Sequence, residues 1–127
     1  MNKIVLGLLL LSSTLFSIEW SKDLETAFNL AKKEHKNIMV VVEGENCRYC
    51  KKLKHRTLSD EAVEKRLEKF VTVKVMREDA SAMSVLPEVK GVPTIFFMNE
   101  DKVISDEILG YVDVEDLIYY INDVEKK

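Results

Sequence analysis

Residues 38–50 read IMVVVEGENCRYC, and the change of character within this stretch predicts the fold. The first five residues, Ile38 to Val42, are all apolar and mostly β-branched, which is typical of a strand buried on both faces. The polar residues 43–46 end that run, and Cys47 begins a segment with helical character. We therefore expect a buried strand that leads directly into a helix, with two cysteines in the first turn of the helix.

The spacing of Cys47 and Cys50 indicates chemistry rather than stabilisation. In the chain-entropy description, a disulfide that closes so short a loop gains only about 2 kcal/mol, against about 4.7 kcal/mol for a loop of about 100 residues. A thiolate at a helix N-terminus is stabilised by unpaired N–H groups and by the helix dipole. We therefore expect Cys47 to be the exposed nucleophile, and Cys50 to be the thiol that resolves a mixed disulfide.

Positive charge continues along the same helix beyond Arg48. The basic residues that follow are Lys51, Lys52, Lys54, His55 and Arg56. Two interpretations are open. The charges stabilise a thiolate at Cys47, with Arg48 as a modulator of the site, or they form an ordinary solvated helix face.

The remaining pattern predicts alternating helices and strands. A helix begins at a cap on Ser21 and ends near Asn37, which is expected to adopt a left-handed conformation. The segment after the strand is expected to form two helical pieces, from Cys47 to about Arg56 and from Ser59 onward. The last helix has Asp113 as its cap.

Three further strands are expected. Apolar and polar residues alternate over residues 71–75, which indicates an edge strand with one wet face. Residues 95–98 are apolar throughout and indicate a central strand, while residues 103–108 again resemble an edge. A crossover helix makes the first two strands parallel, and the short link at residues 99–102 makes the last two an antiparallel hairpin. The prediction is an α/β fold: a mixed four-stranded sheet with helices on both faces.

The first 17 residues are predicted to be a signal peptide that precedes a domain of residues 18–127. Lys3 supplies a positive charge, residues 4–11 are apolar apart from Gly7, and small polar residues follow up to Ser17. The alternative is an uncleaved membrane anchor, but the apolar run is shorter than the roughly 20 residues that a spanning helix needs. We expect cleavage after Ser17 and a periplasmic protein, in a compartment where disulfides persist.

Length and charge limit the functional classes. The chain has 127 residues, of which 46% are apolar and 32% are charged, with a formal net charge of −3. One domain of this size can bury a core without a structural metal. Because no global basic field is present, we expect no nucleic-acid partner.

With the cysteine motif placed between strand and helix, the sequence resembles the thioredoxin-like superfamily over most of residues 18–127. Three features carry the resemblance: Cys47-Arg48-Tyr49-Cys50 after the first strand, Gly91-Val92-Pro93-Thr94 before the central strand, and Gly110-Tyr111 before the last helix. The start of the cysteine helix is most similar to small exported members of that superfamily. The resemblance implies a thiol-disulfide oxidoreductase with a redox-active Cys-x-x-Cys centre, with protein thiols and disulfides as substrates and no cofactor.

The same resemblance implies a role for the loop before the central strand. Pro93 would follow a cis peptide bond and pack beside the cysteines, and the backbone of Val92 would pair with an extended substrate chain. Gly110 would allow close approach of that chain. The alternatives are that Pro93 simply begins a strand and that Gly110 is an ordinary turn glycine.

The sequence departs from thioredoxins proper at two positions. A buried Asp and a Trp are usual there, and this chain has Val41 and Asn46. Glu43 shares the strand face of Val41 and is a candidate substitute as proton acceptor; the alternative is a solvated loop carboxylate.

Two further questions concern the direction of electron transfer and whether the cysteine pair has a different function altogether. Because the chain lacks room for the insertions of dedicated oxidases and isomerases, the resemblance favours a monomeric reductase that takes electrons from a membrane thiol carrier. The alternative is a copper or zinc metallochaperone module that uses Cys47, Cys50 and His55. A third interpretation is an interaction module with an inert disulfide.

Overall fold

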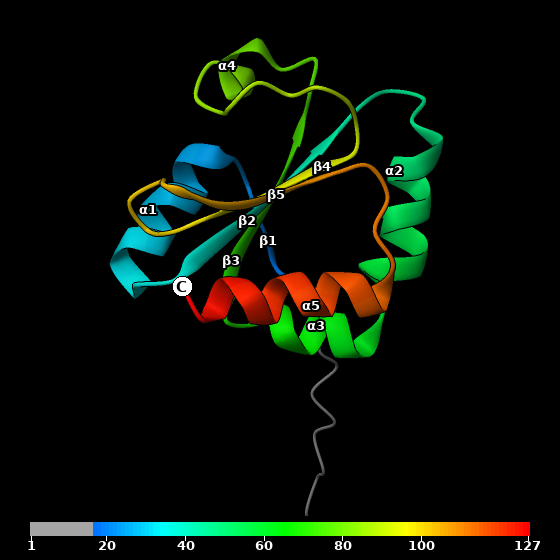
Figure 1. Ribbon diagram of the computed structural model, residues 1–127. Helices are drawn as coiled ribbons and strands as arrows, with labels where there is room; N and C mark the ends of the chain where they lie inside the picture. The colour runs from blue at the N-terminus through cyan, green and yellow to red at the C-terminus, as the bar shows by residue number, and fades with distance from the viewer. Residues whose placement is uncertain (1–16) are drawn as a thin grey trace, which may run out of the picture.

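The computed structural model describes residues 17–127, so the predicted signal peptide lies outside the described residues except for Ser17. Along the chain the elements are β1 (Trp20–Ser21), α1 (Leu24–Glu34), β2 (Asn37–Glu43), α2 (Arg48–Lys52), a π-helical turn η1 (Leu53–Thr57), α3 (Glu61–Leu67), β3 (Phe70–Met76), α4 (Ala80–Met83), β4 (Thr94–Met98), β5 (Ile104–Leu109) and α5 (Val114–Glu125) (Figure 1). Within the described residues, no helix is both long and apolar enough to cross a bilayer.

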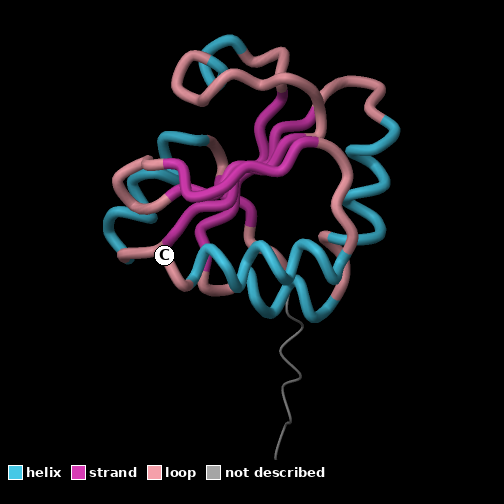
Figure 2. The backbone as a smooth tube through the Cα atoms, viewed as in Figure 1, coloured by secondary structure: helices cyan, strands magenta, loops and turns pink. Residues whose placement is uncertain are grey.

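A mixed sheet forms the middle of the molecule (Figure 2). Its strands lie in the order β1-β3-β2-β4-β5. β2 and β3 are parallel, whereas β4 is antiparallel to both β2 and β5. The α/β class, the mixed sheet, the central place of β4 and the edge position of β5 are confirmed. These pairings put β2 between two long neighbours, as its unbroken apolar run predicts.

At the edge of the sheet opposite β5, two expectations are wrong: the number of strands and the edge position of β3. The sheet has five strands rather than four, because Trp20 and Ser21 pair in parallel with Thr72 and Val73. β3 is therefore interior along part of its length, and Thr72 is buried. A two-residue strand is too short to produce an alternation of apolar and polar residues, so the sequence pattern does not reveal it.

The sheet separates two apolar clusters. One face packs against α1 and is centred on Val40, Val73 and Phe96. The other face packs against η1, α3 and α5 and is centred on Met39, Val41 and Phe97. Alternate residues of β2 thus enter opposite clusters, which confirms that helices cover both faces.

The ends of the first helices differ from the expected positions by one or two residues. Asp23, not Ser21, caps α1, because Ser21 is engaged in β1. The left-handed residue after α1 is His35, with φ of 55°, and Asn37 already belongs to β2. Asp60 rather than Ser59 caps α3, while Asp113 caps α5 as predicted.

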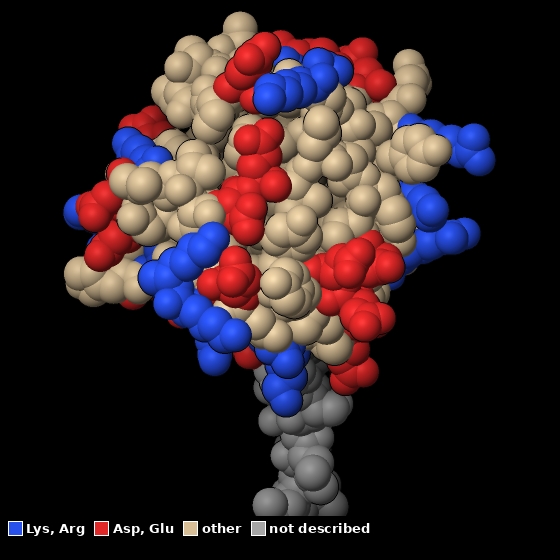
Figure 3. All heavy atoms as spheres, viewed as in Figure 1, with Lys and Arg blue, Asp and Glu red and all other residues tan. Residues whose placement is uncertain are grey.

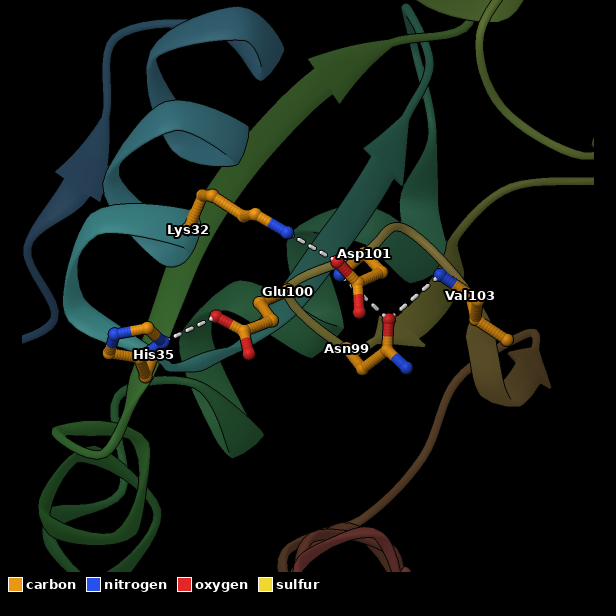
Figure 4. Close-up of polar contacts among 6 residues, drawn as sticks. All are labelled: Lys32, His35, Asn99, Glu100, Asp101 and Val103. Atoms are coloured by element: carbon orange, nitrogen blue, oxygen red, sulfur yellow. Dashed lines mark hydrogen bonds and ion pairs between the residues drawn. The ribbon is translucent and has the colours of Figure 1, made fainter.

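His35 lies where α1 meets the β4–β5 turn (Figure 4). Its Nδ1 atom is 2.8 Å from a carboxylate oxygen of Glu100, and Lys32 pairs with Asp101. Within the turn, the side chain of Asn99 accepts hydrogen bonds from two backbone N–H groups. These contacts fasten α1 to the hairpin at the end of the sheet where β2 begins.

The cysteine helix continues without a break from α2 into η1, so the first predicted helical piece is confirmed, with a π-helical second half. Cys50, Leu53 and Thr57 form its buried side. The Thr57 hydroxyl donates to the carbonyl of Val112 at 2.7 Å, and its oxygen lies 3.4 Å from the Tyr111 hydroxyl. This bond ties the end of η1 to the segment that precedes α5.

Replacing Thr57 with Val keeps the shape of this residue and removes the donor, leaving the Val112 carbonyl unsatisfied. We expect Thr57→Val to lower the free energy of unfolding by about 1–3 kcal/mol, as measured by chemical denaturation. Ser59→Ala is the control, because it removes an exposed hydroxyl that bonds to the His55 carbonyl. That change should stay within about 0.5 kcal/mol. Equal small losses in both variants would contradict this account of Thr57.

Candidate redox site

Cys47 and Cys50 form a disulfide at the N-terminus of α2, with their Cα atoms 5.2 Å apart. β2 brings the chain to this point, and residues 44–46 form the turn into the helix. Cys47 is the N-cap residue, and its Sγ accepts a hydrogen bond from the backbone N–H of Cys50 at 3.1 Å. A sulfur atom therefore occupies the position where an N-cap oxygen usually lies.

The two cysteines differ in access to solvent. Cys50 is only 5% exposed and packs toward the core, whereas Cys47 is partly exposed. A thiolate at Cys47 would meet the free N–H groups of the first helical turn and the positive end of the helix dipole. This arrangement suits an accessible nucleophile at Cys47 and a shielded resolving thiol at Cys50, and this division of roles stays a prediction.

The loop before β4 lies at the same end of the sheet as the cysteines. Val42 pairs with Thr94 in the sheet, so Pro93 is next to the point where the chain leaves β2 toward Cys47. The peptide bond between Val92 and Pro93 is cis. No hydrogen bond among residues 17–127 uses the backbone groups of Val92, which leaves them available to a partner chain.

Two glycines shape this end of the sheet. Gly110 has φ of 91°, a conformation that favours glycine, and its N–H donates to the Pro93 carbonyl at 2.8 Å. A Cβ atom at Gly110 would have open space around it, so the backbone conformation is what favours glycine there. At Gly44, which the sequence analysis missed, a Cβ atom would lie only 3.0 Å from the Val92 side chain. The Gly44 turn and the Pro93 loop therefore pack closely together.

Lys74 lies on the sheet face behind the site and was also missed. It is next to Val41 in the β2–β3 register, and its Nζ atom lies over the Trp20 ring, 4.3 Å from the ring centroid. Burial lowers the pKa of Lys74 below its usual value of 10.5; the Glu43 carboxylate partly opposes this shift and the Lys54 charge adds to it. The only feature of the sequence that could have indicated Lys74 is that it is the one charged residue in the alternating segment 71–75.

Glu43 therefore has a charged neighbour in Lys74. Its backbone carbonyl accepts from the Arg77 N–H at 2.7 Å. Among the described residues, the hydrogen bonds of the cysteine side chains do not include the Glu43 carboxylate. A role for Glu43 as proton acceptor stays a prediction.

The metal-binding alternative needs ligands beyond the two thiols. His55 is exposed on η1, and His35 contacts Glu100 at the other end of the sheet. Within residues 17–127, no three His, Cys, Asp or Glu side chains form a group that could hold a metal ion. The structure thus adds no third ligand to the cysteine pair.

Comparison with known proteins identifies relatives. A family model described as thioredoxin-like matches residues 19–100. Over 94 residues the chain is 32% identical to anterior gradient protein 3 of Xenopus tropicalis and 27% identical to that of Mus musculus, covering 73% of this chain in both cases. The matched region covers 57% and 56% of those proteins, so the chain spans little more than half the length of the curated relatives it matches.

Solved structures with the same fold include a thioredoxin from Thermus thermophilus, with a TM-score of 0.74 and 23% identity. That match covers 85% of this chain and 87% of the other. The C-terminal domain of DsbD from Neisseria meningitidis matches with a TM-score of 0.64 and 24% identity, over 77% of this chain and 90% of the other.

The environment of Lys74 predicts a pH dependence of stability. In the unfolded chain Lys74 binds its proton more tightly than in the folded chain, so protonation penalises the folded state at neutral pH. That penalty is relieved as the pH rises from the lowered pKa toward 10.5. Relative to Lys74→Met, the parent protein should therefore gain stability over this interval in denaturant titrations.

Lys33→Met, which changes an exposed lysine of α1, is the matched control for this experiment. It should give a pH profile parallel to that of the parent. If Lys74→Met also gave a parallel profile, burial of the Lys74 ammonium would have no energetic consequence and this account would be wrong.

Proposed function

Because the chain belongs to the thioredoxin-like family, we propose that it is a thiol-disulfide oxidoreductase that exchanges disulfides with other proteins through Cys47 and Cys50. The observation that carries the proposal is the disulfide at the start of α2, which joins a partly exposed cap sulfur to a buried partner. A disulfide that only stabilised the fold would not require one sulfur to be partly exposed and the other to be buried.

In the direction of client reduction, the reaction begins with Cys47 as a thiolate. Its sulfur attacks one sulfur of the client disulfide, so a mixed disulfide forms and the other client sulfur leaves as a thiolate, which takes up a proton. Cys50 then loses its proton and attacks the Cys47 sulfur, which releases the second client thiol. The client gains two electrons from the two cysteine sulfurs and two protons, one from Cys50 and one from the solvent, to which Cys47 lost its proton on becoming a thiolate. The Cys47–Cys50 disulfide is regenerated.

The protein groups at the site assist these steps. The Cys50 N–H donates to Cys47 Sγ and stabilises negative charge on that sulfur, both when it attacks and when it leaves. The free backbone groups of Val92 would hold an extended client segment by strand addition. Pro93 and Gly110 are joined by a backbone hydrogen bond and would form the wall of that binding site.

The direction and location of the reaction are part of the proposal. The composition of residues 1–17 supports export to the periplasm. There the protein would act as a monomeric reductase of exported proteins and take electrons from a membrane thiol donor. In the connection from β3 to β4, residues 77–93, the only helix is the four-residue α4, so this part of the fold has no large helical insertion.

Single-cysteine variants test the exchange mechanism. Cys50→Ala should retain the attacking thiol and lack the resolving one, so covalent complexes with client proteins or with the electron donor should accumulate. Cys47→Ala is the matched control and should form far fewer, because its remaining thiol is buried. Non-reducing electrophoresis with mass spectrometry of the adducts provides the measurement. A folded Cys50→Ala protein without reductant-sensitive adducts would contradict the two-step exchange.

The reduction potential and the redox state in the cell test the direction. We expect a potential between about −270 mV, typical of thioredoxin, and about −120 mV, typical of a dedicated oxidant. A value above thioredoxin follows because Arg48 adds positive charge near the thiolate and position 41 has a Val in place of an acid. Acid-quenched thiol trapping should find the pair largely reduced. A fully oxidised pair with a potential near the upper value would make the protein an oxidase.

A further inference from the structure

Positive charge is concentrated on one surface beside the disulfide, which we call the basic face. It consists of Arg48, Lys51, Lys52, Lys54, His55 and Arg56, all on α2 and η1. Residues 47–59 contain no Asp or Glu. Residues 17–127 carry 18 Lys and Arg, since only Lys3 precedes them, against 22 Asp and Glu. With the five Lys and Arg of the basic face set aside, 13 basic residues remain against those 22, so the rest of the described surface is strongly acidic.

The helix geometry turns these charges outward. Because Cys50, Leu53 and Thr57 occupy the buried side, the remaining side chains point to solvent, and only Lys52 is partly covered. In Figure 3, Lys and Arg side chains project from the side of the molecule where Figure 1 places α2. Tyr49, which is 55% exposed, and all residues of the basic face except Lys54 line a shallow depression that begins at Arg48, the residue after Cys47.

These charges have no acidic partners in the described part of the chain. Ion pairs there involve basic residues elsewhere, such as Lys32, Lys36 and Lys127. Lys52 instead lies over the Tyr111 ring, 4.3 Å from its centroid. Like charges crowded on one helix repel one another, and an approaching anion would relieve that repulsion. At physiological salt their field extends about 8 Å, which reaches a molecule docked at Cys47 but little further.

Acidic residues limit the width of the basic face. The bond from Thr57 to the Val112 carbonyl places the acidic first turn of α5, with Asp113, Glu115 and Asp116, beside the end of η1. On the other side, the turn before Cys47 carries Glu45, whose N–H bonds to the Glu78 carboxylate. An extended anionic surface would meet these acids, whereas a narrow chain segment would fit between them.

We propose that the basic face is a docking surface for an acidic polypeptide segment next to the reactive disulfide or thiol of the redox partner. This inference rests on the proposed exchange activity and names the chemistry of its partner. The acidic segment pairs with Lys51, Lys54 and Arg56 and brings the partner's sulfur to Cys47. Electrostatic attraction of this kind raises association rates by about 10- to 1,000-fold at low salt.

The test compares two synthetic peptides with the same internal disulfide and the same length, one flanked by Glu residues and the other by Lys residues. Reduced protein is mixed with each peptide, and acid-quenched mass spectrometry follows formation of the Cys47–Cys50 disulfide and of the peptide dithiol. At about 10 mM salt the Glu peptide should react at least about tenfold faster. At about 1 M salt, where the Debye length is about 3 Å, this preference should largely disappear.

Variants then assign the preference to the basic face. Lys51→Glu/Lys54→Glu/Arg56→Glu should reverse it, and the neutral Lys51→Gln/Lys54→Gln/Arg56→Gln should bring the rate ratio close to one. Lys33→Glu/Lys65→Glu/Lys69→Glu is the matched control, since it makes the same change in net charge at exposed positions away from α2. This control should keep the preference for the Glu peptide. Circular dichroism and the melting temperature establish that each variant is folded.

Three outcomes would overturn the inference. In the first, the parent reacts equally with both peptides at low salt. In the second, the control loses the preference as fully as the triple variant, which would indicate that the preference depends only on the net charge of the protein. The third is binding of the parent to phosphatidylglycerol vesicles, lost in the triple variant, without any peptide preference, since the face would then bind membranes. Reaction with neutral 2-hydroxyethyl disulfide separates the two proposals: the rate of each folded variant with this disulfide is the reference to which its two peptide rates are compared, and a parent that does not react at all contradicts the proposed function itself.

Discussion

The burial of β2 on both faces is the constraint on which the rest of the site depends. Val40, Val41 and Val42 are fully buried, and the strand is hydrogen-bonded to β3 on one side and to β4 on the other. The end of β2 therefore cannot shift without disrupting two ladders and two apolar clusters. The position of Cys47, the approach of the Pro93 loop through β4 and the position of Lys74 through β3 all follow from this one strand.

Much of this arrangement could be predicted from the sequence because its signals are local. A continuous apolar run indicates a buried strand, and Asp113 indicates a cap, wherever the rest of the chain lies. The Ser21 and Asn37 predictions were wrong because competing residues took those roles: pairing with β3 drew Ser21 into the sheet, and His35 became left-handed beside the hairpin. Which of several possible capping residues is used depends on tertiary contacts that a local pattern does not contain.

The residues of the site could likewise be predicted where their signals are local, and not elsewhere. The cysteine pair and the Val92–Pro93 loop carry recognisable patterns, and the structure brings both to one end of the sheet. Lys74 and Gly44 were missed because neither is unusual in sequence. A lysine in an alternating strand is expected to face water, and only the two-residue β1 places Trp20 over it. The partners that define these two residues come from distant parts of the chain.

The ion pairs of the described residues all lie at the end of the sheet away from Cys47. They join α1 to the β4–β5 turn, Lys36 to Glu34, and Lys127 to β5 and α5. Exposed pairs of this kind contribute at most about 1 kcal/mol each. The cysteine end is instead held by apolar packing and by uncharged contacts such as Gly110 to Pro93 and Thr57 to Val112. A higher ionic strength therefore weakens the ion pairs at one end of the sheet and the attraction of a charged partner at the other end. A change in reactivity with salt reports how a partner approaches Cys47, because among the described residues no ion pair lies at the end of the sheet that positions the thiol.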